Sequence, residues 1–506
     1  MFENFLLGLG ALLTIENALF MVLGTVIGIL AGAIPGLSST LAISLLVPVT
    51  FVMQPLPALA MLGGIYNGGM FGGSISAALF NVPGAAAACV TVFDGYPMSR
   101  RGESARALQL AVLASFVGGI ISVLALALLA PPLAKLVLMF GPSEYFWVAV
   151  FGISIVVSLS SDSMIKGLLA GLMGMFCAQV GMDPATAYPR FDFGRVELAS
   201  GFLLTAVLLG MFSIPSAISL IEGDKGEESY DAALKSKEKV RLFSWFLPYW
   251  KTYIRSAVIG VIVGIIPAAG GNIASFVAYD TEKKLNKSPE RFGKGAPEGV
   301  IASEAANNGV TGGSFIPLLT MGIPGSPSAA AIMGAFMVQG LVLGPQLFTT
   351  KPDIVYGLIW SLLITNIIML FAGFYGAKLV AKALNLKKEI LAPMIMAFSI
   401  LGVYSMRSNL FDVYVMIGFG VMGYVMKRFG YPASAFILGY ILSPLAESNL
   451  LRALKLSGGS VSGLFNSPLS FLMIGLTILS TCTPMITTMI AKRRSKNQKT
   501  TEEIAL

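Results

Sequence analysis

Apolar runs of about 20 residues recur along nearly the whole chain, and a helix of that length crosses the ~30 Å hydrocarbon core of a bilayer. The apolar side chains are continuous within each run, so helices are expected and the alternating strands of an outer-membrane barrel are not. Charged residues make up 12% of the 506 residues, whereas a soluble domain carries about 25%. The sequence therefore predicts an all-α polytopic membrane protein. The expected spans lie near 17–34, 37–53, 107–130, 144–160, 164–181, 198–220, 255–279, 355–381, 389–405, 411–427, 431–446 and 467–490.

One long polar stretch, residues 222–254, separates these runs near the middle of the chain. It carries charges of both signs and ends in aromatic residues, which are typical of a membrane interface. We interpret it as an interfacial linker between two transmembrane halves, 15–221 and 255–465. A final transmembrane helix is expected at 466–490, and the basic tail at 491–506 is expected in the cytoplasm, because basic segments stay on that side.

The composition excludes several kinds of chemistry. The chain has no histidine, which excludes His-based zinc sites, Ser-His or Cys-His nucleophile pairs and His proton relays. Cys89, Cys177 and Cys482 lie far apart in apolar stretches, so we interpret them as small core residues and not as metal ligands. An intramembrane enzyme would need a nucleophile–base pair or a metal cluster, and the sequence contains neither pattern. We therefore predict no enzyme, no metal centre and no organic cofactor.

The net charge of +8 does not indicate a nucleic-acid partner, because the basic residues cluster as they do in cytoplasmic loops of membrane proteins. Membrane lipid is the expected surrounding. The basic segments are 100–106, 225–255, 283–294, 378–388 and 492–499.

Three motifs occur twice, in the same order, on the two sides of the linker. Each motif is common in membrane helices for packing reasons, but nine matched positions with an offset drifting only from 232 to 241 residues indicate an internal duplication. The pairs are Gly28-x3-Gly32-x2-Pro35 with Gly260-x3-Gly264-x2-Pro267, Asn67-x4-Gly72-Gly73-Ser74 with Asn307-x4-Gly312-Gly313-Ser314, and Pro83-Gly84 with Pro324-Gly325.

The basic residues indicate how the two copies are oriented. The segment 50–60 of the first copy has no Lys or Arg, whereas its partner 281–297 has five. After the second motif the bias reverses, because 100–106 has three arginines and the corresponding region of the second copy has only Lys351. Equivalent loops would then face opposite sides of the membrane. This pattern predicts an inverted-topology repeat, the usual construction of secondary transporters.

Two apolar zones, 60–93 and 305–345, contain many Gly, Pro, Asn, Ser and Thr residues and are predicted to be irregular. We expect broken helices and re-entrant hairpins there, at about 67–92 and 307–332, which meet near the midplane. Irregular backbone at membrane depth is tolerated where it lines a cavity, and half-helix N-termini attract anions while free carbonyls suit Na⁺. The alternative is that these residues are only kinks and close-packing glycines.

The candidate ligands are the small polar residues and backbone groups beside these breaks. Hydroxyls and free N–H groups suit a carboxylate, and side-chain amides can hold either a carboxylate or Na⁺. The predicted substrate-binding set is Pro35, Gly36, Ser38, Ser39, Thr40, Asn81, Pro83, Gly84, Gly325, Ser326 and Ser328. The predicted sodium-binding set is Asn67, Gly72, Ser74, Asn272, Asn307, Asn308, Thr311 and Ser314.

Charged residues in or near the spans are further candidates, since an ionisable group in a membrane usually has a function. Asp94 is expected to be solvated beside the arginine loop. Asp162 and Lys166 are four residues apart on one helix and are expected to pair. Glu304 and Glu447 lie near helix ends beside Asn or Ser and are alternative ion ligands.

The sequence contains the runs Gly32-Ala-Ile-Pro-Gly-Leu37, Tyr66-Asn-Gly-Gly-Met-Phe-Gly-Gly-Ser-Ile-Ser76, Asn81-Val-Pro-Gly84 and Thr91-Val-Phe-Asp-Gly-Tyr-Pro-Met98 in its first half, and Gly312-Gly-Ser and Gly322-Ile-Pro-Gly-Ser326 in its second. These runs resemble the large permease subunit of tripartite tricarboxylate transporters, the TctA family, and the similarity extends roughly over 19–445. It implies a bacterial inner-membrane carrier that imports citrate or related carboxylates with sodium as coupling ion. It also implies two partners, a small transmembrane subunit of about four helices and a periplasmic solute-binding protein.

Two other functions stay open at this point. One is a stand-alone sodium/carboxylate carrier that needs no binding protein, and the other is an anion channel. By analogy with other two-hairpin carriers, we expect an elevator-like movement of the hairpins against a scaffold. The weakly charged loops near 50–60 and 340–355 are candidates for docking a binding protein outside the cell.

Overall fold

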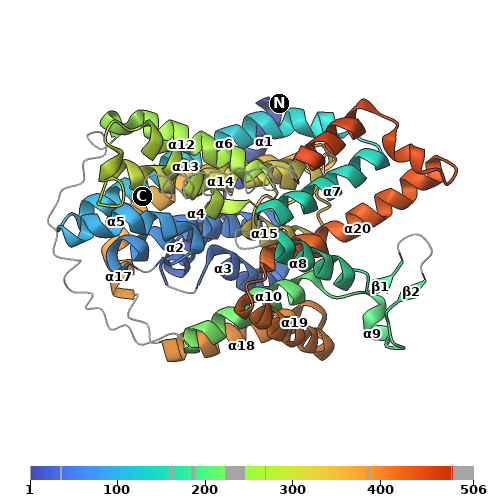
Figure 1. Ribbon diagram of the computed structural model, residues 1–506. Helices are drawn as coiled ribbons and strands as arrows, with labels where there is room; N and C mark the ends of the chain where they lie inside the picture. Colours follow the sequence, from blue (N-terminus) through green and yellow to red (C-terminus); the bar gives the residue numbers. More distant parts are fainter. Residues whose placement is uncertain are drawn as a thin grey trace, which may run out of the picture. The chain divides into compact units, whose positions relative to one another are not determined.

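The computed structural model describes residues 2–34, 37–81, 83–159, 164–183, 188–222, 246–267, 269–383, 388–479 and 481. Almost all of this chain is helical (Figure 1), and the one sheet within these ranges pairs two short antiparallel strands, β1 (Gly181–Met182) and β2 (Pro189–Arg190). Two compact units are formed. The first consists of Met1–Leu138 and Phe202–Arg428, and the second of Met139–Gly201 and the chain from Phe429 onward.

The first unit contains both copies of the duplicated motifs. Its helices in chain order are α1 (Phe2–Leu12), α2 (Ile15–Ala33), α3 (Ser39–Leu46), η1 (Pro48–Val52), α4 (Pro55–Phe80), η2 (Ala86–Ala88), α5 (Cys89–Arg100), α6 (Ser104–Val137), α10 (Leu204–Glu222), η3 (Leu247–Tyr249), α12 (Trp250–Ile265), α13 (Gly270–Leu285), η4 (Pro289–Arg291), α14 (Pro297–Met321), α15 (Pro327–Val338), α16 (Leu347–Thr350), α17 (Pro352–Ala383), α18 (Lys388–Arg407) and α19 (Leu410–Arg428), where η marks a 3₁₀ helix.

The second unit is smaller. It consists of α7 (Pro142–Leu159), α8 (Met164–Cys177), the two strands, α9 (Val196–Ala199), α20 (Ala433–Leu456), η5 (Val461–Phe465) and an apolar helix at Pro468–Leu479. Helix α20 packs against both α7 and α8. The contact with α8 is close because Gly174 and Gly439 each lie directly on a backbone carbonyl of the other helix, as small residues allow in membrane helix pairs.

Five of the helices that the structure describes are long and apolar enough to cross a membrane. They are α2, α6, α19, α20 and the part of α17 from Pro352 to Gly376. Shorter apolar helices accompany them, including Pro468–Leu479, where the final span was expected. The all-α architecture of a membrane protein is confirmed. Residues 223–245 of the expected linker and the tail 491–506 lie outside the described residues.

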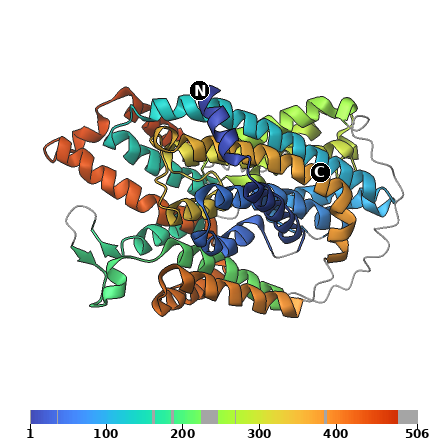
Figure 2. The same cartoon turned by 180° about the vertical axis from the view of Figure 1, so that it is seen from behind.

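Helices α4 and α14 form the centre of the first unit, and nearly every residue in them is buried. Helix α2 packs along α4, α12 packs along α14, and both α6 and α17 contact this centre (Figure 1). Phe71, Leu110, Ile301 and Met369, from four different helices, belong to one apolar core. From behind, the N-terminal α1 is seen lying against α17 (Figure 2).

The expected irregularity of 60–80 and 305–321 is wrong, because α4 and α14 run without interruption to Phe80 and Met321. Their glycines serve close approach instead of breaking the helix. Gly24, Gly28 and Gly32 of α2 lie on three carbonyl oxygens that are one turn apart along α4, and a Cβ atom at any of the three would overlap its carbonyl. In a membrane this packing replaces the hydrophobic driving force between helices, while every backbone hydrogen bond of α4 is kept.

A true break follows each of the two central helices. Asn81 ends α4 with φ of 57°, and Gly322 ends α14 with φ of 73°, both in the left-handed conformation that commonly ends a helix. The chain then turns back, so that Gly84 lies beside Gly73 of α4 and Gly325 lies beside Ser314 of α14. Each break is followed by a shorter helix, α5 after the first and α15 after the second.

Candidate functional site

The N-termini of α3 and α15 meet inside the first unit, and each is capped by its own serine. The hydroxyl oxygen of Ser38 accepts a backbone N–H at 3.2 Å, and that of Ser326 accepts one at 3.1 Å. The Ser328 hydroxyl lies 3.0 Å from that of Ser39 and 2.9 Å from that of Thr40, and all three side chains are buried. The structure therefore brings together five residues of the predicted substrate set, from segments almost 290 residues apart.

A second meeting of helix starts lies close to the first. A Cβ atom added at Gly271, in the first turn of α13, would touch both Ala87 of η2 and the side-chain oxygen of Asn307. Gly270 adopts φ of +64° and lies near the ring of Pro327, the first residue of α15. The N-terminus of α13 thus adjoins both breaks. Asn272, a predicted sodium ligand, is exposed instead of facing this junction.

Three predicted sodium ligands, Asn67, Asn307 and Asn308, lie where α4 crosses α14, and all are buried. The Asn67 amide donates to the carbonyl of Leu362 at 3.1 Å and to the Thr365 hydroxyl at 2.8 Å. Asn307 donates to the carbonyl of Met70 at 3.1 Å, and Asn308 donates to that of Asn67 at 3.4 Å. The N–H groups of these amides therefore tie the helices together.

The oxygens of the same amides have no such role. The Oδ1 atoms of Asn67, Asn307 and Asn308 are buried and accept no hydrogen bond, and the same holds for Asn366 of α17. A buried carbonyl oxygen without a donor costs about 1–3 kcal/mol, so these four oxygens are candidates for contact with an electropositive ligand. The duplicated motif contains Asn67 and Asn307, and Asn308 directly follows the second of them. Nothing in the sequence signals Asn366, which lies within an ordinary apolar span.

The other predicted sodium ligands bond back to their own helices. The hydroxyl of Ser74 donates to the Phe71 carbonyl at 2.7 Å, that of Thr311 to the Asn308 carbonyl at 2.7 Å, and that of Ser314 to the Thr311 carbonyl at 3.0 Å. The Thr311 hydroxyl also lies 3.4 Å from that of Ser122 on α6. Gly72 packs directly against a carbonyl of α2, so its place in the motif is explained by packing.

The remaining predicted substrate residues divide between packing and solvent. Gly84 and Gly325 each contact a glycine carbonyl of the neighbouring helix, α2 or α12. Pro83 is half-buried and Asn81 is exposed. Pro35 and Gly36 lie outside the described residues.

Tyr66 is a buried residue of the site that the sequence did not single out. Its hydroxyl lies 2.7 Å from that of Ser326 and 3.2 Å from that of Ser314. It therefore links α4 of the first copy to the second break. No spacing or motif signals such a contact, because it depends on two segments 260 residues apart.

The expectation that Asp94 is solvated is wrong, because its side chain is fully buried. Its Oδ1 accepts the backbone N–H groups of Gly295 and Ala296, both at 2.7 Å, and its Oδ2 accepts the Tyr279 hydroxyl at 2.9 Å. The start of α14 provides free N–H groups, so α5 folds over it, and Arg101 adds a bond to the Gly295 carbonyl at 2.8 Å. Burial raises the pKa of the Asp94 carboxyl, while these hydrogen bonds oppose that shift.

The other charged candidates lie in different surroundings. Glu304 is fully buried in the first unit and accepts hydrogen bonds from the hydroxyls of Thr91 and Ser115. Glu447, in the second unit, forms an ion pair with Arg190 at 2.5 Å, which favours a structural role. The expected partner of Lys166, Asp162, lies outside the described residues, and Lys166 donates to the Phe429 carbonyl at 2.6 Å.

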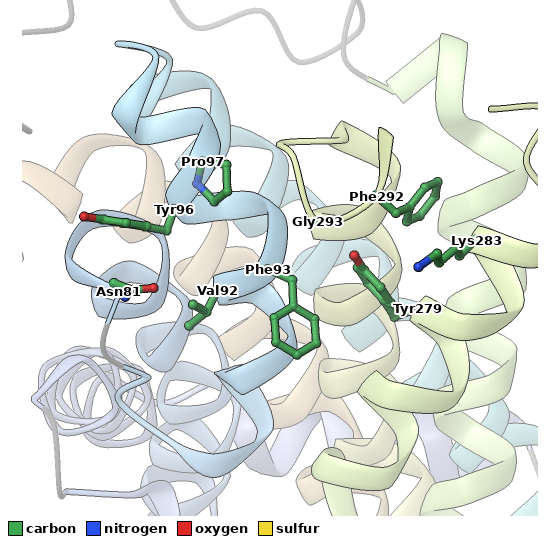
Figure 3. A pocket seen from close by; sticks show the side chains of 9 residues that line it. All are labelled: Asn81, Val92, Phe93, Tyr96, Pro97, Tyr279, Lys283, Phe292 and Gly293. Carbon is green, nitrogen blue, oxygen red and sulfur yellow. The ribbon is translucent and has the colours of Figure 1, made fainter. Parts of the chain in front are cut away.

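A pocket of about 440 Å³ opens between α5 and α13 (Figure 3). Figure 3 shows Asn81 and Tyr96 on one wall and Lys283 and Phe292 on the other, with Phe93 between them. The lining is largely aromatic and contains one ammonium group, that of Lys283. The lining residues are Asn81, Val92, Phe93, Tyr96, Pro97, Tyr279, Lys283, Phe292 and Gly293.

Comparison with protein families decides the class of the molecule. The model of the tripartite tricarboxylate transporter TctA family matches residues 18–438. The chain belongs to this TctA family. Since this is a family of transporters, and five described helices can cross a membrane, the TctA chain is a multi-pass membrane protein. The resemblance drawn from the first-half motifs is confirmed.

Two similar proteins come from Agrobacterium vitis. An uncharacterized 52.8 kDa protein from the 3′ region of ttuC′ in TAR-I is 37% identical over 503 residues, 98% of both chains. An uncharacterized protein from the 3′ region of ttuC′ in TAR-II is 38% identical over 234 residues, 46% of this chain and 97% of its own length. No solved structure matches this TctA chain.

The motifs that underlie the TctA resemblance lie around the two places where helix N-termini meet. Gly32 of the first run contacts the carbonyl of Gly69, and Tyr66 and Asn67 open the second run and bond to distant helices. The fourth run, 91–98, contains Asp94, which fastens α5 to the start of α14. The fourth run thus contributes contacts that hold α5, the helix after the first break, in place.

Proposed function

We propose that this TctA chain is the permease subunit of a binding-protein-dependent secondary transporter. It imports tricarboxylates such as citrate, or related carboxylates, coupled to a sodium gradient and by alternating access. Its partners are a small transmembrane subunit and a periplasmic solute-binding protein, and its place is the bacterial inner membrane with a cytoplasmic C-terminus. Membership of the TctA family supports the assignment as a transporter permease. The observation that supports the position of the substrate site is the buried contact between the N-termini of α3 and α15.

The chemistry of that meeting suits a carboxylate. Each helix N-terminus carries about half a positive charge on its free N–H groups, and two of them converge beside the hydroxyls of Ser39, Thr40 and Ser328. These three side chains can donate to carboxylate oxygens once they exchange their mutual hydrogen bonds for bonds to the substrate. Dipoles and hydroxyls would then hold an anion that carries several charges, with a bound cation balancing part of them.

The buried amide oxygens support sodium as the coupling ion. Asn67, Asn308 and Asn366 each present an Oδ1 without a hydrogen-bond donor, at or near the crossing of α4 with α14. Na⁺ is commonly coordinated by carbonyl oxygens at unwound helices in transporters. Such an ion would satisfy the oxygens and place a positive charge near the anion.

Matched contacts in the two copies support the inverted repeat. Gly84 lies on Gly32 as Gly325 lies on Gly264, with offsets of 241 and 232 residues. Both breaks begin with a left-handed residue, and the offset between Asn81 and Gly322 is also 241. The same scaffold thus occurs twice.

The loops between these elements support opposite orientation of the copies. The basic segment 100–106 of the first copy lies beside the basic segment 283–295 of the second, joined by Arg101 and Gly295 at 2.8 Å. The uncharged segment at Thr50–Met53 lies beside the end of α15, where Gln339 donates to the Thr50 carbonyl at 2.5 Å. Basic loops then share the cytoplasmic side and uncharged loops share the outer side, where the binding protein would dock.

Alternating access is proposed to occur by an elevator-like movement of the segments after the two breaks. Cysteines that cross-link α15 to α3, or α5 to α14, would test it. Transport lost on cross-linking and regained on reduction is the expected result. Transport that survives every such cross-link would rule the movement out.

The direct test is reconstitution. The full chain and its small subunit would be placed in liposomes, and uptake of labelled citrate would be measured under an inward Na⁺ gradient, with and without the periplasmic binding protein. We expect uptake only with Na⁺ and the binding protein. Uptake without the binding protein would indicate a stand-alone carrier, flux far above carrier rates without a Na⁺ gradient would indicate a channel, and no citrate uptake would reject that substrate.

A further inference from the structure

We propose that Glu304 is the charged ligand of a sodium site formed by α5, α6 and α14. None of the residues assigned above to sodium carries a charge, and Glu304 supplies one on α14, one helical turn before Asn307 and Asn308. The inference deepens the proposed sodium coupling and rests on it for the ion's role in transport. The binding itself can be tested without any carboxylate.

The surroundings of Glu304 are rich in oxygen atoms. Its side chain has no exposed surface. Its Oε1 accepts the Thr91 hydroxyl of α5, and its Oε2 accepts the Ser115 hydroxyl of α6 at 3.3 Å. The hydroxyl of Ser303 lies 3.0 Å from that of Thr91. Asn307, one helical turn further along α14, also hydrogen-bonds to Glu304.

No positive side chain balances this carboxylate in the part of the chain that the structure describes, since none of its ion pairs includes Glu304. Three charged groups on the helices packed against α14 have other partners. Arg106 of α6 pairs with Glu103, Arg255 of α12 pairs with Glu282 of α13, and Asp94 of α5 is held by the start of α14. A carboxylate buried without a counter-charge is costly, so a bound cation is the missing partner.

The oxygens around Glu304 suit a sodium ion in kind and number. Na⁺ prefers several hard oxygen ligands, and Glu304, Thr91, Ser303 and Ser115 supply carboxylate and hydroxyl oxygens from three helices. Asn307 adds an independent observation, because its side chain is 1% exposed and its Oδ1 accepts no hydrogen bond. That oxygen faces Gly271 in the first turn of α13, and it belongs to the side chain whose amide N–H group reaches Glu304.

The position of Thr91 connects the site to the first break. Thr91 is the third residue of α5, the helix that begins after Gly84. An ion held between Thr91 and Glu304 would fasten the start of α5 to α14, and its release would free that end. Occupancy of this site would thus determine the position of a segment that borders the proposed substrate site.

The test is binding of ²²Na⁺ to the purified full chain in detergent, measured by scintillation proximity with K⁺ as the balancing salt. E304Q keeps the shape and removes the charge, and we expect at least a tenfold loss of Na⁺ affinity. E304D should weaken binding without abolishing it. The matched control is E290Q, which removes an exposed carboxylate of η4 and should bind Na⁺ as the unmodified chain does.

A second readout guards against misfolding of the variants. Na⁺, but not K⁺, should raise the melting temperature of the unmodified chain and of E290Q, and should leave that of E304Q unchanged. Equal Na⁺ affinity and equal Na⁺-dependent melting shifts in E304Q and E290Q would overturn the proposal. Absence of citrate uptake in an otherwise Na⁺-binding chain would reject the proposed substrate and leave the Glu304 site standing.

Discussion

The two breaks of the first unit share one backbone geometry and differ in their side chains. Gly84 and Gly325 each lie on a glycine carbonyl of the adjacent helix, α2 or α12. After the first break come four alanines at 85–88, whereas after the second come Ser326 and Ser328. The proposed repeat would therefore keep its turns and exchange the groups that they present.

Each break also faces a different partner. We call the meeting of α3 with α15 the hydroxyl junction, which contains Ser39, Thr40 and Ser328. We call the meeting of α13 with η2 the carboxylate junction, which contains Asn307 and, behind it, Glu304. Helix N-termini with neutral hydroxyls favour an anion, and a carboxylate favours a cation. On the proposed function, the divergence of the two copies separates substrate from coupling ion.

The largest effect should follow from filling the space at either break. In G84A and in G325A the added Cβ would overlap a glycine carbonyl oxygen, and overpacking of this kind costs about 1–3 kcal/mol. We expect about 3 kcal/mol of lost unfolding free energy in both variants, measured by denaturant titration in detergent. G418A is the control, since nothing lies within 4 Å of that position. A loss in only one of the two variants would contradict their equivalence.

A somewhat smaller effect should follow from removing Asp94, which has no counterpart in the second copy because Ala335 stands 241 residues on. D94A leaves the N–H groups of Gly295 and Ala296 without an acceptor. Each unsatisfied group costs about 1–3 kcal/mol, and water entering the site offsets part of it, so we expect about 2 kcal/mol. E103A removes a half-buried surface ion pair and should cost under about 1 kcal/mol.

The hydroxyl junction is tested by removing one hydroxyl. A hydrogen bond to a charged group contributes about 1.5–3 kcal/mol, so S328A should raise the half-saturating carboxylate concentration about tenfold, with the Na⁺ dependence unchanged. The measurement is uptake in liposomes at varied substrate and fixed Na⁺.

The matched change installs a hydroxyl at the other junction. Ala87 lies beside Gly271, and A87S should leave the half-saturating carboxylate concentration unaltered. If S328A and A87S changed the half-saturating concentrations of substrate and of Na⁺ to the same extent, the assignment of substrate to one junction and Na⁺ to the other would be wrong.

Much of the fold followed from the sequence, because it depends on local signals. Continuous apolar runs predicted the helices, and Asn81 and Gly322 stand where the central helices end. The glycines of 60–80 were misinterpreted, because the sequence alone does not distinguish a glycine that ends a helix from one that lets another helix approach. Only the partner decides, and Gly68, for example, faces the backbone of α2.

The candidate site followed only in part. Ser38 and Ser326 were singled out as small hydroxyls beside a proline break, which is a local pattern, and they cap α3 and α15. Their role as substrate ligands stays a prediction. The burial of Asp94 and the contributions of Tyr66 and Asn366 were not found. Each depends on a contact with a distant segment, such as Tyr66 with Ser326 at 2.7 Å, and spacing carries no information about such a contact.

The smallest predicted effect concerns Tyr66, whose counterpart 240 residues on is Ala306. Its hydroxyl contacts Ser326, the residue that caps α15. We therefore expect Y66F to weaken substrate binding at the hydroxyl junction without abolishing it. A neutral buried hydrogen bond contributes about 1 kcal/mol, and we expect a two- to fivefold rise in the half-saturating carboxylate concentration. Y375F, at an exposed tyrosine of α17, is the control. If Y66F raised the half-saturating Na⁺ concentration more than that of the substrate, Tyr66 would contribute to the carboxylate junction. The two junctions would then act as one site.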